Sequence, residues 1–111
     1  MNEKERKQQR NHELAAIIKN TYGKPELRNE YNAACEEFLK SYSGLVHSYA
    51  IKYKTNNKKL IYEDLVIHFQ NSLIAACNSY DEAKKLNVTT YLIKALDFAS
   101  FAFHHEDITQ N

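Results

Sequence analysis

Apolar residues recur every three or four positions along most of the chain, which is the spacing of one face of an α-helix. Residues 3–22 are rich in strong helix formers. Their apolar positions at this spacing are Leu14, Ile17, Ile18 and Tyr22. Gly23 suits the end of this first helix, and Pro25 suits the first turn of a second one. The pattern therefore predicts two helical elements that meet near Gly23.

The second predicted helix runs from residue 26 to about residue 53. Its apolar stripe comprises Leu27, Tyr31, Ala34, Cys35, Phe38, Leu39 and Tyr42, followed by Leu45, Val46, Tyr49, Ala50 and Tyr53. Ser43 and Gly44 lie between the two parts of the stripe and predict a bend or a brief interruption. Residues 55–59 are polar and aperiodic, so we expect a loop there.

The third predicted helix covers residues 62–80 and carries a wide apolar stripe. The stripe comprises Leu65, Val66, Phe69, Leu73, Ala76, Cys77 and Tyr80. Residues 81–88 are rich in charge and predict a connector, in which residues 82–86 have the composition of one helical turn. Connections of this length are usual between the helices of a compact bundle.

A fourth predicted helix reaches about His104, with Thr89 or Thr90 as its N-cap. From Tyr91 to Phe103 its polar positions are only Lys94, Asp97 and Ser100. A helix that is apolar on nearly every side is either enclosed or keeps one face for a partner. Four helices in 111 residues do not easily enclose one of their own, so we expect a partner face. The residues assigned to this face are Phe98, Phe101 and Phe103.

Composition supports the helical interpretation and bounds the architecture. Two glycines and one proline argue against a turn-rich β-sandwich and against a glycine-rich phosphate loop. A length of 111 residues suits one domain with one modest core. We therefore predict an all-α fold, a compact bundle of about four helices. Residues 1–24 would form an N-terminal helix or arm, residues 25–106 the helical domain, and residues 107–111 a tail.

The formal net charge is +1, but the two parts of the chain differ in sign. Residues 1–60 hold 12 Lys and Arg against 7 Asp and Glu, whereas residues 61–111 hold 3 against 7. The basic first part is compatible with binding to nucleic acid or to an acidic protein surface. For the run from Lys4 to Arg10, a solvated helix face is the simpler interpretation.

The sequence contains no apolar stretch of about 18 residues and no signal-peptide core. Cys35 and Cys77 stand alone, without paired or metal-site spacing. We therefore predict a cytoplasmic protein with no membrane contact, in which both thiols are reduced and pack as small apolar residues.

No arrangement of residues indicates catalysis, a cofactor or a metal. His104 and His105 are adjacent, so on a helix they would point about 100° apart and could not share one ion. Glu63 and Asp64 precede an apolar helix and are explained by the positive end of its dipole. A nucleophile beside a base is not visible, and a small bundle offers little concavity for a substrate. We therefore predict that the chain is not an enzyme.

One segment mixes cations, hydroxyl groups and an aromatic ring. It comprises Lys84, Lys85, Thr89, Thr90, Tyr91 and Lys94. This mixture suits single-stranded DNA, because cations hold the phosphates while a ring stacks on a base. A solvated connector that leads into a helix cap would have the same composition, so both interpretations stay open.

Several segments in this order resemble region 2 of bacterial sigma factors of the sigma-70 type. They are residues 43–53 (SGLVHSYAIKY), 63–66 (EDLV), 73–76 (LIAA), 80–81 (YD) and 89–91 (TTY). The run from Asp64 to Tyr91 needs no gap against the family pattern, and the resemblance covers residues 38–104. It implies that residues 25–106 are a domain similar to sigma region 2.

The resemblance also implies partners and contact residues. In that family the second-to-last long helix docks on the clamp helices of the RNA polymerase β′ subunit. The last helix and the connector before it melt the promoter −10 element and hold its non-template strand. The implied polymerase contacts are Glu63, Asp64, His68 and Asn71. The implied DNA contacts are Lys84, Lys85, Asn87, Thr90, Tyr91 and Lys94.

This chain departs from the family at several polar positions. Residues 67–69 read Ile-His-Phe where the family has Gln-Glu-Gly, and the Trp pair of primary factors falls on Lys94 and Ala95. Asp97 stands where the family has an arginine, and a carboxylate repels a phosphate backbone. Apolar scaffold positions are thus kept, while several polar working positions are not.

Three functions remain open at this point. In the first, the chain would be a sigma-like regulator: half of a split factor, a truncated factor, or a small sigma-like protein of a phage or mobile element. Nothing after residue 104 corresponds to the helix-turn-helix that reads the −35 element. Its partners would then be the RNA polymerase core, promoter DNA, and a separate region 4-like or anti-sigma protein. Alternatively, it is an adaptor that pairs through its apolar last helix with itself or a regulatory partner. A third possibility is a polymerase inhibitor that occupies the clamp without reading a promoter.

Overall fold

The computed structural model describes residues 1–81 and 87–109, with side chains as far as Phe101 and that of Phe103. These residues form five α-helices and one 3₁₀-helix, and they contain no β-strand. The α-helices are α1 (Glu3–Thr21), α2 (Arg28–Ser41), α3 (Ser43–Asn56), α4 (Tyr62–Ser79) and α5 (Val88–Thr109), and the 3₁₀-helix is η1 (Pro25–Leu27). The prediction of an all-α bundle is confirmed, with five α-helices instead of about four.

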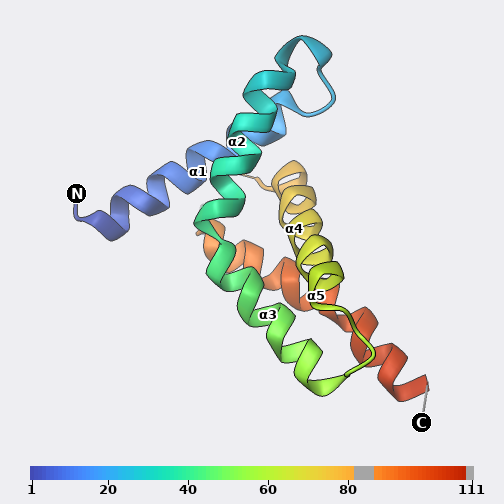
Figure 1. The fold of residues 1–111 in the computed structure, drawn as a ribbon. Coiled ribbons are helices and arrows are strands. Elements are labelled where there is room, and N and C mark those ends of the chain that lie inside the picture. The colour runs from blue at the N-terminus through green and yellow to red at the C-terminus, as the bar shows by residue number, and fades with distance from the viewer. Residues whose placement is uncertain (82–86, 110–111) are drawn as a thin grey trace.

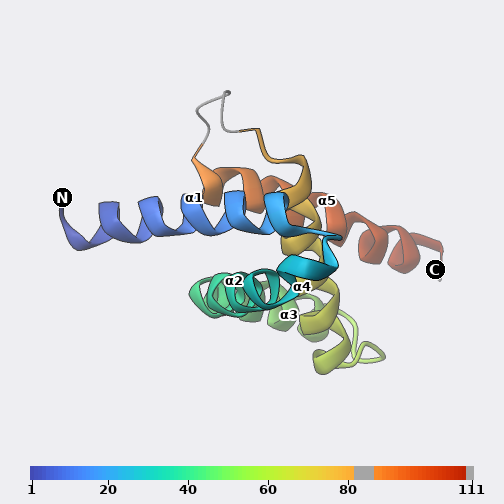
Figure 2. The same ribbon diagram turned by 90° about the horizontal axis from the view of Figure 1, so that it is seen from above.

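The five helices pack around α4, which contacts each of the other four. In Figure 1, α2 and α3 follow one another along one side of the molecule, with α4 beside α3 and α5 crossing behind both. Seen from above, α1 lies between the α2–α3 pair and the first half of α5 (Figure 2). The first turns of α1 and the last turns of α5 project in opposite directions from the body (Figures 1 and 2).

The second half of α1 belongs to the bundle, which the sequence pattern had left open. Leu14, Ala15 and Ile18 are buried in the core, whereas residues 1–10 are exposed. The helix begins at the N-cap Asn2, whose side-chain oxygen accepts a hydrogen bond from the amide of Glu5 at 2.8 Å. It ends as predicted near Gly23, which has a φ of 72° that only glycine adopts without strain.

The predicted helix over residues 26–53 is divided into α2 and α3 at Tyr42. There the backbone leaves the helical region, with φ −105° and ψ 14°, just before Ser43 and Gly44, which are weaker helix formers than alanine. The buried residues nevertheless continue at helical spacing across the break. They are Phe38, Tyr42, Val46, Ala50 and Tyr53. Both helices therefore pack on the same core.

A group of aromatic rings joins α3, α4 and α5, and we call it the ring cluster. It comprises Tyr49, Tyr53, His68, Phe69 and Phe103. Phe69 of α4 lies at its centre and is completely buried. Its ring is 5.6 Å from that of Tyr49 and 6.0 Å from that of Phe103, both nearly edge to face, as aromatic pairs prefer. The cluster fixes the distance between the helices on either side of α4.

The start of α5 differs from the sequence prediction. The helix begins at Val88, and the cap is Asn87, whose side-chain oxygen accepts a hydrogen bond from the amide of Thr89 at 2.8 Å. Thr89 and Thr90 therefore lie inside the first turn, and the prediction of a threonine cap is wrong. Asparagine is at least as good an N-cap as threonine, and its position one residue before Val88 allows the helix to start earlier.

The two glycines provide a matched test of this backbone. At either position an added methyl group would meet no atom within 4 Å. Gly23→Ala should therefore lower the free energy of unfolding by about 1–2 kcal/mol, because only the left-handed backbone is strained. Gly44→Ala, in the first turn of α3, should raise it by about 0.4–1 kcal/mol. Urea unfolding of the three proteins checks both, and a neutral Gly23→Ala would contradict the left-handed turn.

Candidate functional site

The side of α4 that faces away from the core is exposed along most of the helix. We call it the α4 outer face. It comprises Glu63, Asp64, Ile67, Asn71 and Ala75. These positions recur every three or four residues, so they form one stripe. The opposite stripe of Leu65, Phe69 and Leu73 is buried to within 2% of complete. The helix thus separates a structural side from a free side.

The loop before α4 holds the start of this face in place. The ammonium group of Lys54 donates hydrogen bonds to the carbonyl oxygens of Lys58 and Leu60, at 2.9 and 2.6 Å. The amide of Leu60 donates to the carbonyl oxygen of Asn57, which closes a turn. The hydroxyl of Tyr62 lies 2.7 Å from the ring nitrogen of His47 on α3. These contacts determine where the first turn of α4 presents its side chains.

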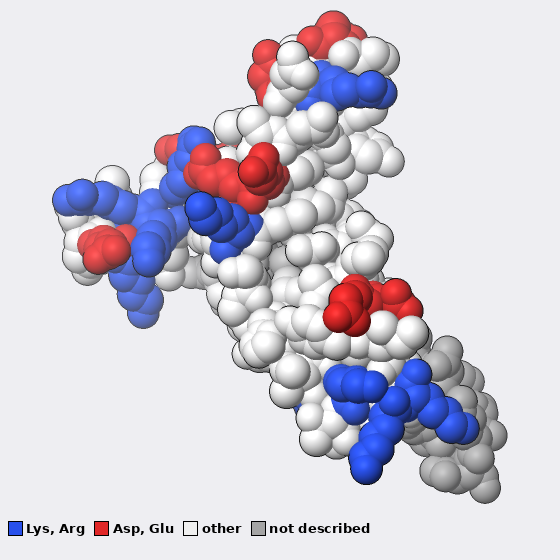
Figure 3. Space-filling model, viewed as in Figure 1, with Lys and Arg blue, Asp and Glu red and all other residues white. Residues whose placement is uncertain are grey.

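The first turn of α4 is acidic. Glu63 and Asp64 are both exposed there, and Figure 3 shows acidic side chains gathered over the beginning of this helix. Both carboxylates are stabilised by the positive end of the helix dipole. In the described part of the chain, neither carboxylate takes part in a salt bridge. The charge of this turn is therefore available to a partner.

The structure separates the four residues implied as polymerase contacts. Glu63, Asp64 and Asn71 lie together on the α4 outer face. His68 is half-buried between α4 and α5, where its ring nitrogen lies 3.3 Å from the carbonyl oxygen of Ala99. Its ring also packs against Phe69 and Phe103. We therefore place His68 in the helix contact and not on the outer face.

Sequence reasoning missed Ile67, which is 55% exposed in the middle of the α4 outer face. From its residue type alone, an isoleucine in an apolar helix is expected to be buried in the core. The signal that could have identified it is its position, three residues after Asp64 and four before Asn71, outside the buried stripe. The face therefore combines an acidic end with an apolar centre.

The residues implied as DNA contacts are also divided. Lys84 and Lys85 lie outside the described residues. Asn87 caps α5, and Thr90 and Lys94 are exposed. Tyr91 is half-buried: its hydroxyl is 2.6 Å from that of Ser79, and its ring packs 5.6 Å from the ring of Tyr80. A base could stack on Tyr91 only after these contacts were given up.

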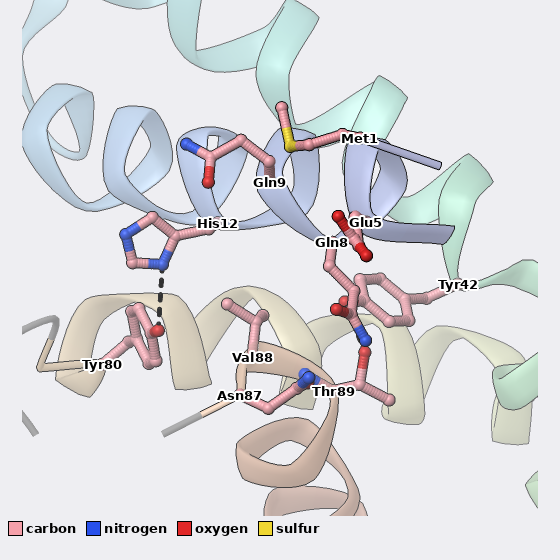
Figure 4. A pocket seen from close by; sticks show the side chains of 10 residues that line it. All are labelled: Met1, Glu5, Gln8, Gln9, His12, Tyr42, Tyr80, Asn87, Val88 and Thr89. Atoms are coloured by element: carbon pink, nitrogen blue, oxygen red, sulfur yellow. Dashed lines mark hydrogen bonds between the residues drawn. The ribbon is translucent and has the colours of Figure 1, made fainter. Parts of the chain in front are cut away.

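Two pockets flank α1 where it passes the start of α5. The first has a volume of about 540 Å³, and Figure 4 shows its lining side chains. One wall holds His12, whose ring nitrogen is 3.0 Å from the hydroxyl of Tyr80. The second, of about 620 Å³, lies between Lys4 and Lys7 of α1 and Thr90 of α5. Sequence reasoning missed this contribution of α1, because only the fold brings residues 4–12 beside residues 87–90.

The three phenylalanines assigned to a partner face do not share one environment. Phe98 and Phe101 are 82% and 66% exposed on α5. Phe103 is half-buried in the ring cluster, with its ring 5.0 Å from that of His68. Because Phe103 faces the core, the exposed apolar surface among the described side chains of α5 consists of Phe98 and Phe101, together with Ile93, which is 38% exposed.

Asp97 has a structural contact that the sequence did not reveal. The hydroxyl of Tyr49 on α3 donates a hydrogen bond to its carboxylate at 2.5 Å. Burial and this bond raise the pKa of Tyr49 to about 12. The bond links α3 to α5, so Asp97 is accounted for without any contact to DNA.

The described residues contain no group of three or more His, Cys, Asp or Glu side chains that could hold a metal ion. Nor does any described helix have the length and apolar character needed to cross a membrane. Comparison of the chain with protein-family models, with curated proteins and with solved structures found no significant match.

The Tyr49–Asp97 hydrogen bond predicts a specific pH dependence. Because the pKa of Tyr49 is higher in the folded protein than in the unfolded chain, its contribution to stability is complete below pH 10 and is lost as the pH rises through about 12. Tyr49→Phe should lower the free energy of unfolding by roughly 1 kcal/mol at pH 8. Urea unfolding between pH 8 and pH 12 should show this difference disappearing at the alkaline end. A difference that stays constant would contradict the raised pKa.

Proposed function

We propose that this chain is a sigma-like transcription protein that binds RNA polymerase through the α4 outer face. The partner surface would be the clamp helices of the β′ subunit, as the resemblance to sigma region 2 implies. One observation carries the proposal. The apolar positions of the family-like motif, such as Leu65 and Leu73, are buried, while its acidic pair, Glu63 and Asp64, is exposed.

This separation is what docking by a helix requires. Acidic residues in the first turn of a helix are favoured by its dipole and are usually exposed, so exposure alone does not define a docking surface. What supports the proposal is that the pair lies at one end of an exposed stripe that continues through Ile67 and Asn71. An exposed apolar residue beside a fixed charge is a common composition for a binding surface, since the first supplies contact area and the second supplies orientation.

Promoter contact has less support than docking in this chain. Asp97 would repel a phosphate backbone, and Phe98 and Phe101 offer it no positive charge. Tyr91 is engaged with Ser79 and Tyr80. The proposal is therefore that the chain binds the polymerase. The start of α5 is a second, weaker candidate, for contact with single-stranded DNA.

Reversal of one charge tests the docking surface. Asp64→Arg should weaken binding of the full chain to bacterial core RNA polymerase at least tenfold, because the positive charge of the arginine cancels the negative charge of Glu63 and the first turn loses its net negative charge. The matched control is Glu30→Arg, which reverses an exposed charge in the first turn of α2. It replaces a favourable interaction between a side chain and the helix dipole with an unfavourable one, as Asp64→Arg does. Fluorescence anisotropy of an N-terminally labelled chain measures both affinities.

The control should bind as the wild type does. Equal binding of Asp64→Arg and wild type would remove the α4 outer face from the interface, and no binding of the wild type would refute the proposed function. An excess of wild-type chain should also displace a primary sigma factor from the core enzyme, because both would occupy the clamp helices. Circular dichroism spectra of the variants confirm that each is folded.

A further inference from the structure

The outer side of α5 carries the two most exposed aromatic side chains among the described residues, Phe98 and Phe101. Ile93, Phe98 and Phe101 are 38%, 82% and 66% exposed, and Lys94 and Asp97 lie among them. These five positions form one helix stripe, which we call the α5 outer face. Leu92 and Leu96 on the opposite side are buried to within 1% of complete. The stripe is therefore not needed for the core of one chain.

The order of residues on this face is self-complementary. If two copies of α5 cross antiparallel with a two-fold axis between residues 95 and 96, Lys94 of each copy lies opposite Asp97 of the other. The same register places Phe101 opposite Thr90, and it brings the two Phe98 side chains to one flank of the pair and the two Ile93 side chains to the other. A parallel pair would instead bring Lys94 against Lys94 and Asp97 against Asp97. Charge therefore favours one orientation, and a two-fold pair forms each favourable contact twice.

Two features of the single chain prepare this face for a second copy. The hydroxyl of Tyr49 holds the carboxylate of Asp97 by a hydrogen bond, so one charge of the pair is fixed before association. Beside Phe98, a shallow groove of about 270 Å³ runs between α5 and α4. The α4 side of this groove carries only small side chains, which are Ser72, Ala75, Ala76 and Ser79. An apolar side chain from the second copy has room to enter.

We propose that the α5 outer face binds a second copy of this chain as an antiparallel two-fold pair. The three apolar side chains expose roughly 300–400 Å² in each copy, given that a phenylalanine buries about 200 Å² when fully covered. Two such patches are smaller than a standard interface of about 1,200–2,000 Å², so the dimer is weak and reversible, with a dissociation constant in the micromolar range. The inference does not depend on polymerase binding, because it uses α5 and meets the α4 outer face only at Ala75, at the end opposite the acidic turn.

Sedimentation velocity of the full chain between about 1 and 500 µM tests the dimer, since this range brackets a micromolar dissociation constant. The wild type should pass from monomer to dimer as its concentration rises. Phe98→Glu should raise the dissociation constant at least tenfold. The matched control is Ile51→Glu, which places the same charge at a 43% exposed apolar residue of α3 and should dimerise as the wild type does.

A charge exchange tests the register. Lys94→Glu and Asp97→Lys should each lose self-association, because each places like charges opposite one another at both contacts. An equimolar mixture of the two variants should form a heterodimer, since opposite charges then meet again. If loss of the Tyr49 contact unfolds Asp97→Lys, which circular dichroism detects, the Lys94→Glu and Phe98→Glu results still decide the proposal.

Three outcomes would overturn the inference. They are a wild type that stays monomeric throughout the range, a Phe98→Glu variant that dimerises normally, and a folded mixture of charge variants that does not associate. If the wild type is monomeric and Phe98→Glu weakens binding to core polymerase, the α5 outer face belongs to that interface. Because polymerase binding is measured separately with Asp64→Arg, failure of the dimer leaves the proposed docking surface intact.

Discussion

Burial of one stripe of α4 is the constraint on which the rest of the structure depends. This helix contacts all four of the others, and Phe69 at its centre is enclosed by rings from α3 and α5. Side chains in a core pack as densely as in organic crystals, so the ring contacts leave little freedom in the distances between these helices. The direction of the buried stripe also determines which residues of α4 remain outside.

The two candidate surfaces follow from this arrangement. A helix on the surface of a small domain usually buries one apolar stripe. A chain of 111 residues has too few helices to cover the second side of α4 or of α5. The uncovered side of α4 carries an acidic turn and an isoleucine, whereas that of α5 carries two phenylalanines beside a lysine and an aspartate. The first composition fits a basic partner surface, and the second fits its own copy. One protein could thus use adjacent helices for different partners.

The role assigned to Asp97 differs between the sequence alone and the structure, in which its neighbours are known. In the comparison with the sigma pattern, Asp97 replaces an arginine on the helix that contacts DNA in that family, and its carboxylate would repel the phosphate backbone. In the structure it accepts a hydrogen bond from Tyr49 and helps to join α3 to α5. A carboxylate with such a partner needs no DNA contact to explain its presence, and its charge remains available at the surface. His68 and Phe103 change in the same way, since both belong to the ring cluster and not to an open binding face.

The sequence by itself determined the helical class, the buried stripes and the turn at Gly23, because helical spacing and glycine conformation are local properties that neighbouring residues dictate. It also located Asp64 and Phe98 on helices that keep a free side. Ser43 and Gly44 also predicted the interruption that separates α2 from α3. Only the tertiary structure decided that α1 lies beside the start of α5, and that Ile67 is outside while Phe103 is inside. These outcomes depend on which helices pack together, and residue type alone does not distinguish the two sides of an almost entirely apolar helix. Contacts between residues far apart in the chain, such as Tyr49 with Asp97, arise only when the helices are placed in space.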